Sequence, residues 1–159
     1  MTLLEKEPVK RVEKILKEFD SKLSVIVLNT TARTAIDAAT SLSCEVGAIV
    51  KSLLFRTNDS FALFLIAGDK KASLNKIKKI LNKKDVSMAT ADEVKDITGF
   101  TIGGVSPVGH LTKINIFIDT SLERFSTLFA AAGHPNCVFK INFTNLRILT
   151  NGLIREISE

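Results

Sequence analysis

The sequence predicts a mixed α/β fold, because segments with helical spacing of apolar residues alternate with apolar runs of strand length. Its 159 residues correspond to about one domain, and 45% apolar with 25% charged residues is typical of a globular protein. No internal repeat, linker or low-complexity stretch divides the chain. We therefore expect a single domain that spans residues 1–159.

The N-terminal part of the chain predicts a helix, a strand and a second helix. Apolar residues recur at helical spacing over 9–19, and Pro8 suits the first helical turn. The β-branched run at 25–28 predicts a strand. Residues 34–37 form a capping pattern, which begins a helix of small residues that can pack closely on a sheet.

Two apolar runs in the middle of the chain predict a β-hairpin. They span 46–55 and 61–66, and turn residues lie between them at 58–59. Because polar residues are scarce in both runs, we expect both strands to be buried on two faces and central in the sheet. A helix over 74–81, capped by Ser73, follows.

A capping box at 90–93 predicts a short helix that ends at Gly99, directly before a glycine-rich loop. The remaining predicted elements are a strand at 114–119, a segment at 125–130 that favours a strand over a helix, a turn at 133–136, a strand at 138–141 and a last helix from about Thr144.

The composition excludes several classes of protein. Tyr and Trp are absent, which excludes base stacking by those side chains, and the net charge of +5 is compatible with a polyanionic partner without requiring one. Cys44 and Cys137 are far apart and lack metal-ligand spacing, so we expect neither a disulfide framework nor a metal or other cofactor. No segment has the pattern of a signal peptide or a spanning helix, so we expect a cytoplasmic protein that does not contact the membrane.

The strongest local signal is the segment Gly103–Gly109, which has three Gly and one Pro in seven residues. Glycines let a ligand approach the main chain, and Pro107 stiffens the loop. Exposed N–H groups in such a loop can hold a phosphate or a developing oxyanion. An ordinary connection between a helix and a strand explains the pattern about equally well. The loop matches neither nucleotide-binding fingerprint.

Lys51 interrupts a run that otherwise predicts a buried strand. A buried lysine costs several kcal/mol unless it is paired, so we expect Lys51 to face an anion, a cleft or the sheet edge. A lysine that extends from an edge strand to water is the commoner arrangement.

The other charged and polar candidates are ambiguous. A dense lysine run between Lys70 and Lys84 contains no acidic residue, and it predicts either a solvated helix face or a surface that contacts phosphates. His110 and His134 each lie in a turn rich in Gly and Pro, where a surface turn residue is the simpler interpretation. Ser106-Pro107 lacks the Gly-x-Ser-x-Gly elbow, which argues against a serine hydrolase.

Five segments in combination carry a resemblance to a known family. They are Arg33-Thr34-Ala35, Cys44 to Leu53, Thr98 to His110, Ile118-Asp119 and Ala131 to Asn136. In this order and spacing they resemble the YbaK/EbsC family, which is related to the editing insertion domain of bacterial prolyl-tRNA synthetase. The resemblance covers nearly the whole chain, and it implies a curved mixed β-sheet or partial barrel flanked by helices.

The resemblance also implies roles for individual residues. Those expected at the catalytic centre are Lys51, Gly103, Gly104, Gly133 and His134. Those expected to contact the substrate are Thr34, Ser52, Val105, Ser106, Pro107, Gly109, His110 and Ala132. The lysine run adds candidate RNA contacts at Lys70, Lys71, Lys76 and Lys79.

The activity implied by the resemblance is hydrolysis of the ester that joins a wrong amino acid to tRNA. The expected substrate is tRNA(Pro) or a similar tRNA carrying Ala, Cys, Ser or Thr. An aminoacyl ester is already activated, so oriented water and backbone N–H groups suffice without a triad or a metal. A non-catalytic module that binds tRNA or an aminoacyl-tRNA synthetase stays open as the alternative.

Overall fold

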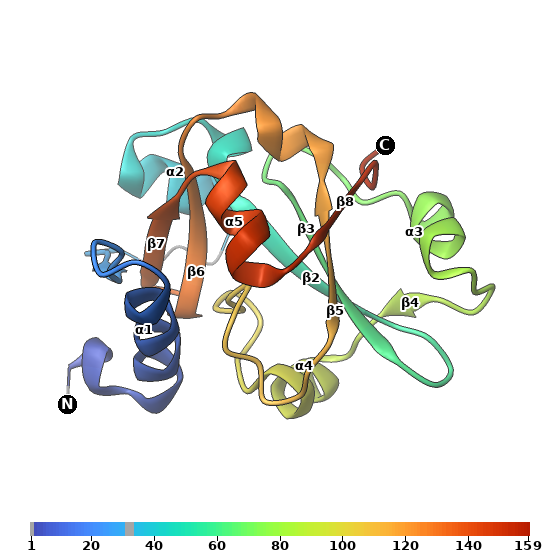
Figure 1. Ribbon diagram of the computed structural model, residues 1–159, viewed down its shortest axis with the longest axis horizontal. Helices are drawn as coiled ribbons and strands as arrows, with labels where there is room; N and C mark the ends of the chain where they lie inside the picture. The colour runs from blue at the N-terminus through green and yellow to red at the C-terminus, as the bar shows by residue number, and fades with distance from the viewer. Residues whose placement is uncertain (1, 31–33) are drawn as a thin grey trace.

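A five-stranded mixed sheet forms one half of the computed structural model, which describes residues 2–30 and 34–159 (Figure 1). Its strand order is β4-β2-β3-β5-β8. Strand β3 pairs antiparallel with β2 and parallel with β5, so the hairpin occupies the interior of the sheet as predicted. The strands are β4 (Ser87–Met88), β2 (Val50–Arg56), β3 (Phe61–Ala67), β5 (Asn115–Asp119) and β8 (Leu153–Arg155).

A second, three-stranded antiparallel sheet lies beside the first and has the order β1-β7-β6. Its strands are β1 (Ile26–Val27), β7 (Cys137–Ile141) and β6 (Leu128–His134). A single parallel bridge, Ile49 to Phe129, joins the two sheets among the described residues. The strands therefore curve around a common core without closing into a barrel, which confirms the predicted mixed α/β class.

Helices cover the outer surfaces of the two sheets (Figure 1). Helix α1 packs against β6, whereas α3 lies on the opposite side of the molecule next to β4. The α-helices are α1 (Glu7–Phe19), α2 (Ala35–Leu42), α3 (Leu74–Leu81), α4 (Ala91–Thr98) and α5 (Phe143–Thr150). The 3-10 helices are η1 (Leu3–Glu5), η2 (Val46–Ala48) and η3 (Thr120–Arg124).

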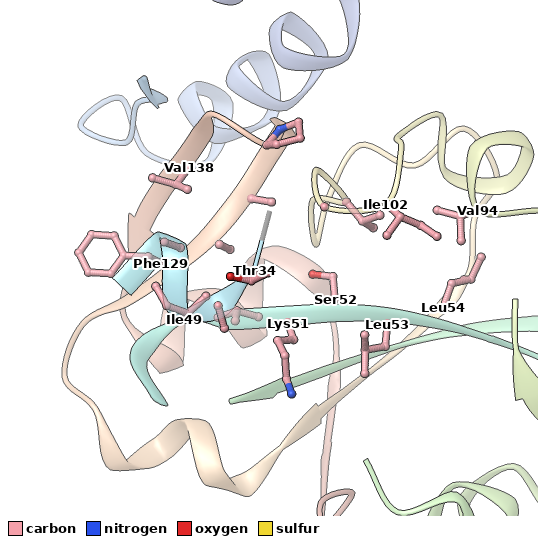
Figure 2. Close-up of a pocket in the computed structure, with 18 of the residues that line it drawn as sticks. Thr34, Ile49, Lys51, Ser52, Leu53, Leu54, Val94, Ile102, Phe129 and Val138 are labelled. Atoms are coloured by element: carbon pink, nitrogen blue, oxygen red, sulfur yellow. The ribbon is translucent and has the colours of Figure 1, made fainter. Parts of the chain in front are cut away.

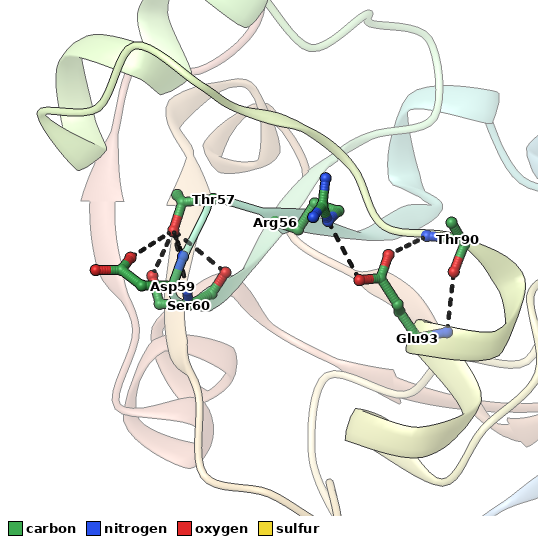
Figure 3. Close-up of polar contacts among 6 residues, drawn as sticks. All are labelled: Arg56, Thr57, Asp59, Ser60, Thr90 and Glu93. Carbon is green, nitrogen blue, oxygen red and sulfur yellow. Dashed lines mark hydrogen bonds and ion pairs between the residues drawn. The ribbon is translucent and has the colours of Figure 1, made fainter.

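Local hydrogen bonds fix the position of the turn between β2 and β3 and the start of α4 (Figure 3). Thr57 Oγ1 accepts from the amide of Ser60 at 3.0 Å and donates to Asp59 Oδ1 at 2.9 Å, which closes the turn between β2 and β3. Thr90 and Glu93 form the predicted capping box. Glu93 also accepts from Arg56 Nε at 3.2 Å, which ties α4 to the end of β2.

A buried carboxylate ties the C-terminal segment to the sheet. Asp119 ends β5 with only 1% of its surface exposed. Its Oδ1 accepts from the amides of Ile157 at 2.6 Å and Ser158 at 3.0 Å, and its Oδ2 accepts from Ser158 Oγ at 2.8 Å. Burial alone would raise the pKa of Asp119, but these hydrogen bonds and one from Ser121 hold the pKa below its ordinary value.

Several sequence predictions need correction at the ends of elements. Residues 46–48 form the 3-10 helix η2 rather than the start of the strand, so β2 begins only at Val50. Strand β6 runs over 128–134 instead of 125–130, which places Gly133 and His134 in a strand and confines the turn to Pro135 and Asn136. Strands β4 and β8 were not predicted.

Candidate active site

A cavity of about 220 Å³ lies between β2, the glycine-rich loop and the second sheet (Figure 2). Its walls are mainly aliphatic, so it suits a small side chain better than a polar head group. Its lining residues are Thr34, Ala35 and Ala38 at the start of α2; Ile49 to Leu54 along β2; Met88, Ala89 and Val94 near β4 and α4; Ile102, Gly103 and Val105 in the loop; and Phe129, Ala130, Ala131, Pro135, Cys137 and Val138 in the second sheet.

The two neighbouring polar residues of β2 point in opposite directions. Figure 2 shows the Ser52 hydroxyl directed towards the cavity and the Lys51 ammonium directed away from it, because successive side chains alternate across a strand. The Lys51 ammonium donates to the main-chain oxygen of Lys70. Partial burial lowers the pKa of Lys51, with nearby Asp69 opposing this shift and Lys71 adding to it. Lys51 therefore reaches the cavity only with the part of the residue close to its backbone.

Ser52 carries an unusual polar group for this cavity. Its Oγ is buried, and it has no hydrogen-bond partner among the residues that the structure describes. An unpaired buried hydroxyl costs about 1–3 kcal/mol. Ser52 pairs with Leu65 of β3 on one side of β2. On the other side β4 pairs only with Phe55 and Arg56, so within residues 2–30 and 34–159 no strand covers that side at Ser52. A ligand that hydrogen-bonds to Ser52 Oγ would therefore recover this energy.

The loop that contains Gly103–Gly109 runs from Ile102 to His110, and its first half, Ile102 to Val105, forms the wall that faces the second sheet. Gly103 has a φ of 94°, which L side chains rarely adopt. A Cβ on Gly104 would lie 2.9 Å from the Cα of His134, so the loop touches the backbone of β6 there. The Gly104 amide donates to Thr101, whereas the amides of Gly103 and Val105 make no hydrogen bond with any described residue. Two unpaired amides beside a cavity are suited to stabilising an oxyanion.

The second half of the loop, Ser106 to His110, is fixed from within and does not line the cavity. Ser106 is fully buried, and its Oγ accepts from the amide of Val108 at 3.2 Å. His110 Nε2 lies 2.7 Å from the main-chain oxygen of Ser106, and Arg11 Nε donates to the main-chain oxygen of Gly109 at 2.5 Å. Burial lowers the pKa of His110, the hydrogen bond to Ser106 opposes the shift, and Arg11 adds to it.

The Gly133 segment also lies behind the cavity wall rather than in it. A Cβ on Gly133, whose φ is 95°, would lie 2.8 Å from the main-chain oxygen of Pro8. Ala132 is fully buried in the core, and His134 Nδ1 accepts from the amide of Asn136 at 3.0 Å. The bulge between Ala131 and His134 shifts the strand register at this point.

The structure thus brings together only part of the predicted set. Thr34, Ser52, Gly103, Val105 and the backbone end of Lys51 line one cavity. The other predicted site residues lie outside its lining: Gly104, Ser106, Pro107, Gly109, His110, Ala132, Gly133 and His134. Substrate contact by this second set stays a prediction. Arg33, which contributed to the resemblance, lies outside the described residues.

Of the apolar side chains that shape the cavity, only Val105 was predicted from the sequence to belong to the site. Ile102 borders it with 62% of its surface exposed, and Ala130, Ala131 and Phe129 supply one wall. The only signal for the alanines was the run of small residues before Gly133. A run of this kind indicates close packing without saying which residue faces a cavity.

The candidate RNA-contacting lysines lie on the other side of β2, at and before α3 (Figure 1). Lys71, Lys76 and Lys79 are exposed, and Lys76 Nζ donates to the main-chain oxygen of Ser158 at 2.7 Å. Within the described part of the chain, no group of His, Cys, Asp and Glu side chains is placed to hold a metal ion. No helix there is long and apolar enough to span a membrane.

Known proteins share both the sequence and the fold. The uncharacterized protein YwhH of Bacillus subtilis (strain 168) is 31% identical over 134 residues, which cover 84% of this chain and 85% of that protein. Proline–tRNA ligase of Caldicellulosiruptor saccharolyticus is 25% identical over 154 residues, which cover 96% of this chain and 26% of the ligase. The chain thus spans about a quarter of that ligase.

Solved structures extend this similarity to three dimensions. A crystal structure provisionally assigned as a trans-editing enzyme for prolyl tRNA synthetase has a TM-score of 0.91 and 34% identity, and the match covers 97% of this chain and 98% of that one. The hypothetical protein APE2540 has a TM-score of 0.87 and 27% identity, and the match covers 94% and 99% of the two chains. The model of the aminoacyl-tRNA editing domain matches residues 29–149, which include β2, the glycine-rich loop and β6. The chain therefore belongs to the aminoacyl-tRNA editing domain family.

Proposed function

We propose that the chain is a deacylase that acts in trans and hydrolyses the ester of mischarged tRNA. The observation that carries this proposal is an apolar cavity with two kinds of unpaired polar group, the Ser52 hydroxyl on one wall and the Gly103 and Val105 amides on the facing loop. Membership of the editing family supports the reaction class.

The cavity supports a small amino acid as the one removed. Its mainly apolar, alanine-rich wall supports Ala, Cys, Ser or Thr as the amino acid removed. Ser52 offers a hydrogen bond either to the α-amino group, which every substrate has, or to a side-chain hydroxyl. Thr34 borders the same cavity, although its Oγ1 already accepts from the amide of Asp37 at 3.1 Å.

The proposed reaction needs no protein nucleophile. Water attacks the ester carbonyl carbon, the carbonyl oxygen becomes an oxyanion, and the bond from carbon to the ribose oxygen then breaks. One proton of the water passes to the ribose oxygen, the other passes to solvent, and the amino acid leaves as a carboxylate. The Gly103 and Val105 amides stabilise the oxyanion, a kind of contact worth about 3–4 kcal/mol per donor in other enzymes. The neighbouring ribose hydroxyl orients the water, because no described side chain in the cavity is a general base.

The proposed function is tested with tRNA(Pro) charged in turn with Ala, Cys, Ser, Thr and Pro. We expect purified protein to release one or more of the four small non-cognate amino acids and to leave prolyl-tRNA intact. Ser52→Ala should lower kcat/KM by about tenfold, which corresponds to one buried hydrogen bond of about 1.4 kcal/mol. Ser126→Ala, an exposed serine outside this cavity, serves as the matched control. No release from any of the charged tRNAs would rule out the enzymatic proposal.

A non-catalytic module that binds tRNA or a synthetase is the second candidate, and the exposed lysines of α3 favour it. Both candidates predict that the protein binds tRNA, but only the deacylase predicts that it releases the amino acid. Retention of labelled tRNA by the wild type and by Ser52→Ala, with no amino acid released by either, would establish the module instead.

A further inference from the structure

A groove of about 470 Å³ lies on the face of β2 opposite the cavity. Leu53 and Phe55 of β2, with Val86 before β4 and Leu74 at the start of α3, supply its apolar surface. Lys51 and Lys71 add cationic groups. We propose that this groove holds the nucleotides that precede the terminal adenosine of the tRNA 3′ end. The inference rests on the proposed deacylase function and adds the path of the RNA strand to it.

The groove is continuous with the cavity. Lys51, Leu53 and Met88 line both hollows, so the two meet around the edge of β2. Strand β4 is only two residues long and covers β2 only at Phe55 and Arg56. A flexible single strand whose last residue carries the ester in the cavity can therefore pass over this short edge and enter the groove.

The groove combines cationic and apolar groups. Single-stranded nucleic acids bind where cationic groups meet the phosphates and apolar surface meets the faces of the bases. Leu74 is 42% exposed and Met88 is 55% exposed, so apolar surface is already open to solvent here.

The charge balance of the groove is positive. The acidic residue that acts on Lys51 is Asp69, and its carboxylate is held by Arg124 through contacts of 2.7 and 3.0 Å. No Asp or Glu among the described residues lines the groove. The lysines of α3 continue the positive surface beyond it. The groove therefore complements a polyanion that also has apolar faces, such as single-stranded RNA. A neutral apolar ligand would use the apolar surface alone, and a small anion would use the lysines alone.

The test compares two substrates that carry the same ester. One is mischarged tRNA, and the other is the 3′-aminoacyl ester of adenosine, which lacks all preceding nucleotides. We expect Lys71→Glu to lower kcat/KM on mischarged tRNA about tenfold and Leu74→Gln to lower it about threefold, as single RNA contacts do. Both variants should hydrolyse the adenosine ester at the wild-type rate. Lys10→Glu, at an exposed lysine of α1, makes the same charge change far from the groove and should leave both rates unchanged.

Equal loss on the two substrates, or no loss on either, would overturn the inference while leaving the deacylase proposal in place. If the wild type releases no amino acid from either substrate, the deacylase proposal fails, and binding then tests the groove alone. A labelled, uncharged RNA oligonucleotide ending in CCA should bind about tenfold more weakly to Lys71→Glu than to Lys10→Glu. Equal binding to these two variants would overturn the groove assignment.

Discussion

The two halves of the glycine-rich loop differ in what holds them. Ile102 to Val105 borders the cavity, and two of its amides make no hydrogen bond with the described residues. Ser106 to His110 is fastened by internal hydrogen bonds and by Arg11 of α1. The second half is a buried support that fixes the position of the first. Adjacent residues of one motif therefore have separate tasks, one in binding and one in folding.

The largest effect is expected at Gly104, where the loop touches β6. In Gly104→Ala the new Cβ would lie 2.9–3.0 Å from three backbone atoms of His134, which cannot rotate away. Such overpacking costs about 1–3 kcal/mol, which corresponds to a Tm about 2–12 °C lower for a chain of this size. A displacement of the loop by about 1 Å also lowers deacylation about 100-fold.

Calorimetry and deacylation of mischarged tRNA measure both effects, and Thr101→Ala at an exposed neighbouring side chain is the control. A Gly104→Ala protein with unchanged Tm and activity would show that the loop does not depend on this contact.

The next effect concerns pH and belongs to the supporting half. Burial lowers the pKa of His110 below its ordinary value of about 6.5, so the unfolded chain binds a proton more readily than the folded one. The stability contributed by neutral His110 is present above about pH 6.5 and is lost as the pH falls through the folded-state pKa, by at most about 1.4 kcal/mol per pH unit.

Urea unfolding at pH 7.5, 6.5 and 5.5 measures this loss, and His110→Asn should remove the slope. The carboxylates with lowered pKa values, such as Asp119, lose their contribution only below about pH 4, which lies outside the range of this measurement. A wild type and a His110→Asn variant with the same pH slope would contradict the assignment of His110 to the folding half.

The smallest effect is expected at Ile102, in the cavity-lining half. Because 62% of its surface is exposed, Ile102→Ser should change the free energy of unfolding by no more than about 0.5 kcal/mol. Loss of its apolar contact with the substrate should raise KM about threefold and leave kcat unchanged. Steady-state kinetics beside urea unfolding test this, and a loss of stability without a change in KM would reverse the roles of the two halves.

Periodicity in the sequence was sufficient for the larger elements of the fold. The helices and the central hairpin carry repeated apolar spacing, and their positions are confirmed to within a few residues. Strands β4 and β8 have two and three residues, too few to form a pattern. The apolar residues at 46–48 were predicted to begin a strand, but they form η2. Gly47 lies against the Phe125 ring there, so closely that a Cβ on Gly47 would be 2.6 Å from it. That constraint comes from a residue distant in sequence, so no local pattern contains it.

The site was harder to predict than the fold for the same physical reason. Glycine content marks a tight loop, but it does not distinguish Gly103, which borders the cavity, from Gly133, which packs on α1. Lys51 was expected to face an anion, a cleft or an edge, and its side chain enters the groove. The second sheet curves over one face of β2, and that face borders the cavity. The spacing of residues along β2 does not predict which face this is.

The hydrogen bonds that the buried Asp119 carboxylate accepts affect the order in which the sheet forms during synthesis. The donors, Ile157 and Ser158, lie 38 and 39 residues later in the chain. Because the chain is made from its N-terminus, the hairpin and β5 exist before the residues that satisfy the Asp119 carboxylate. Until those residues pack against β5, the charged carboxylate keeps its water. We therefore expect the end of β5 to be buried only after Ile157 and Ser158 have been made, with the hairpin already formed.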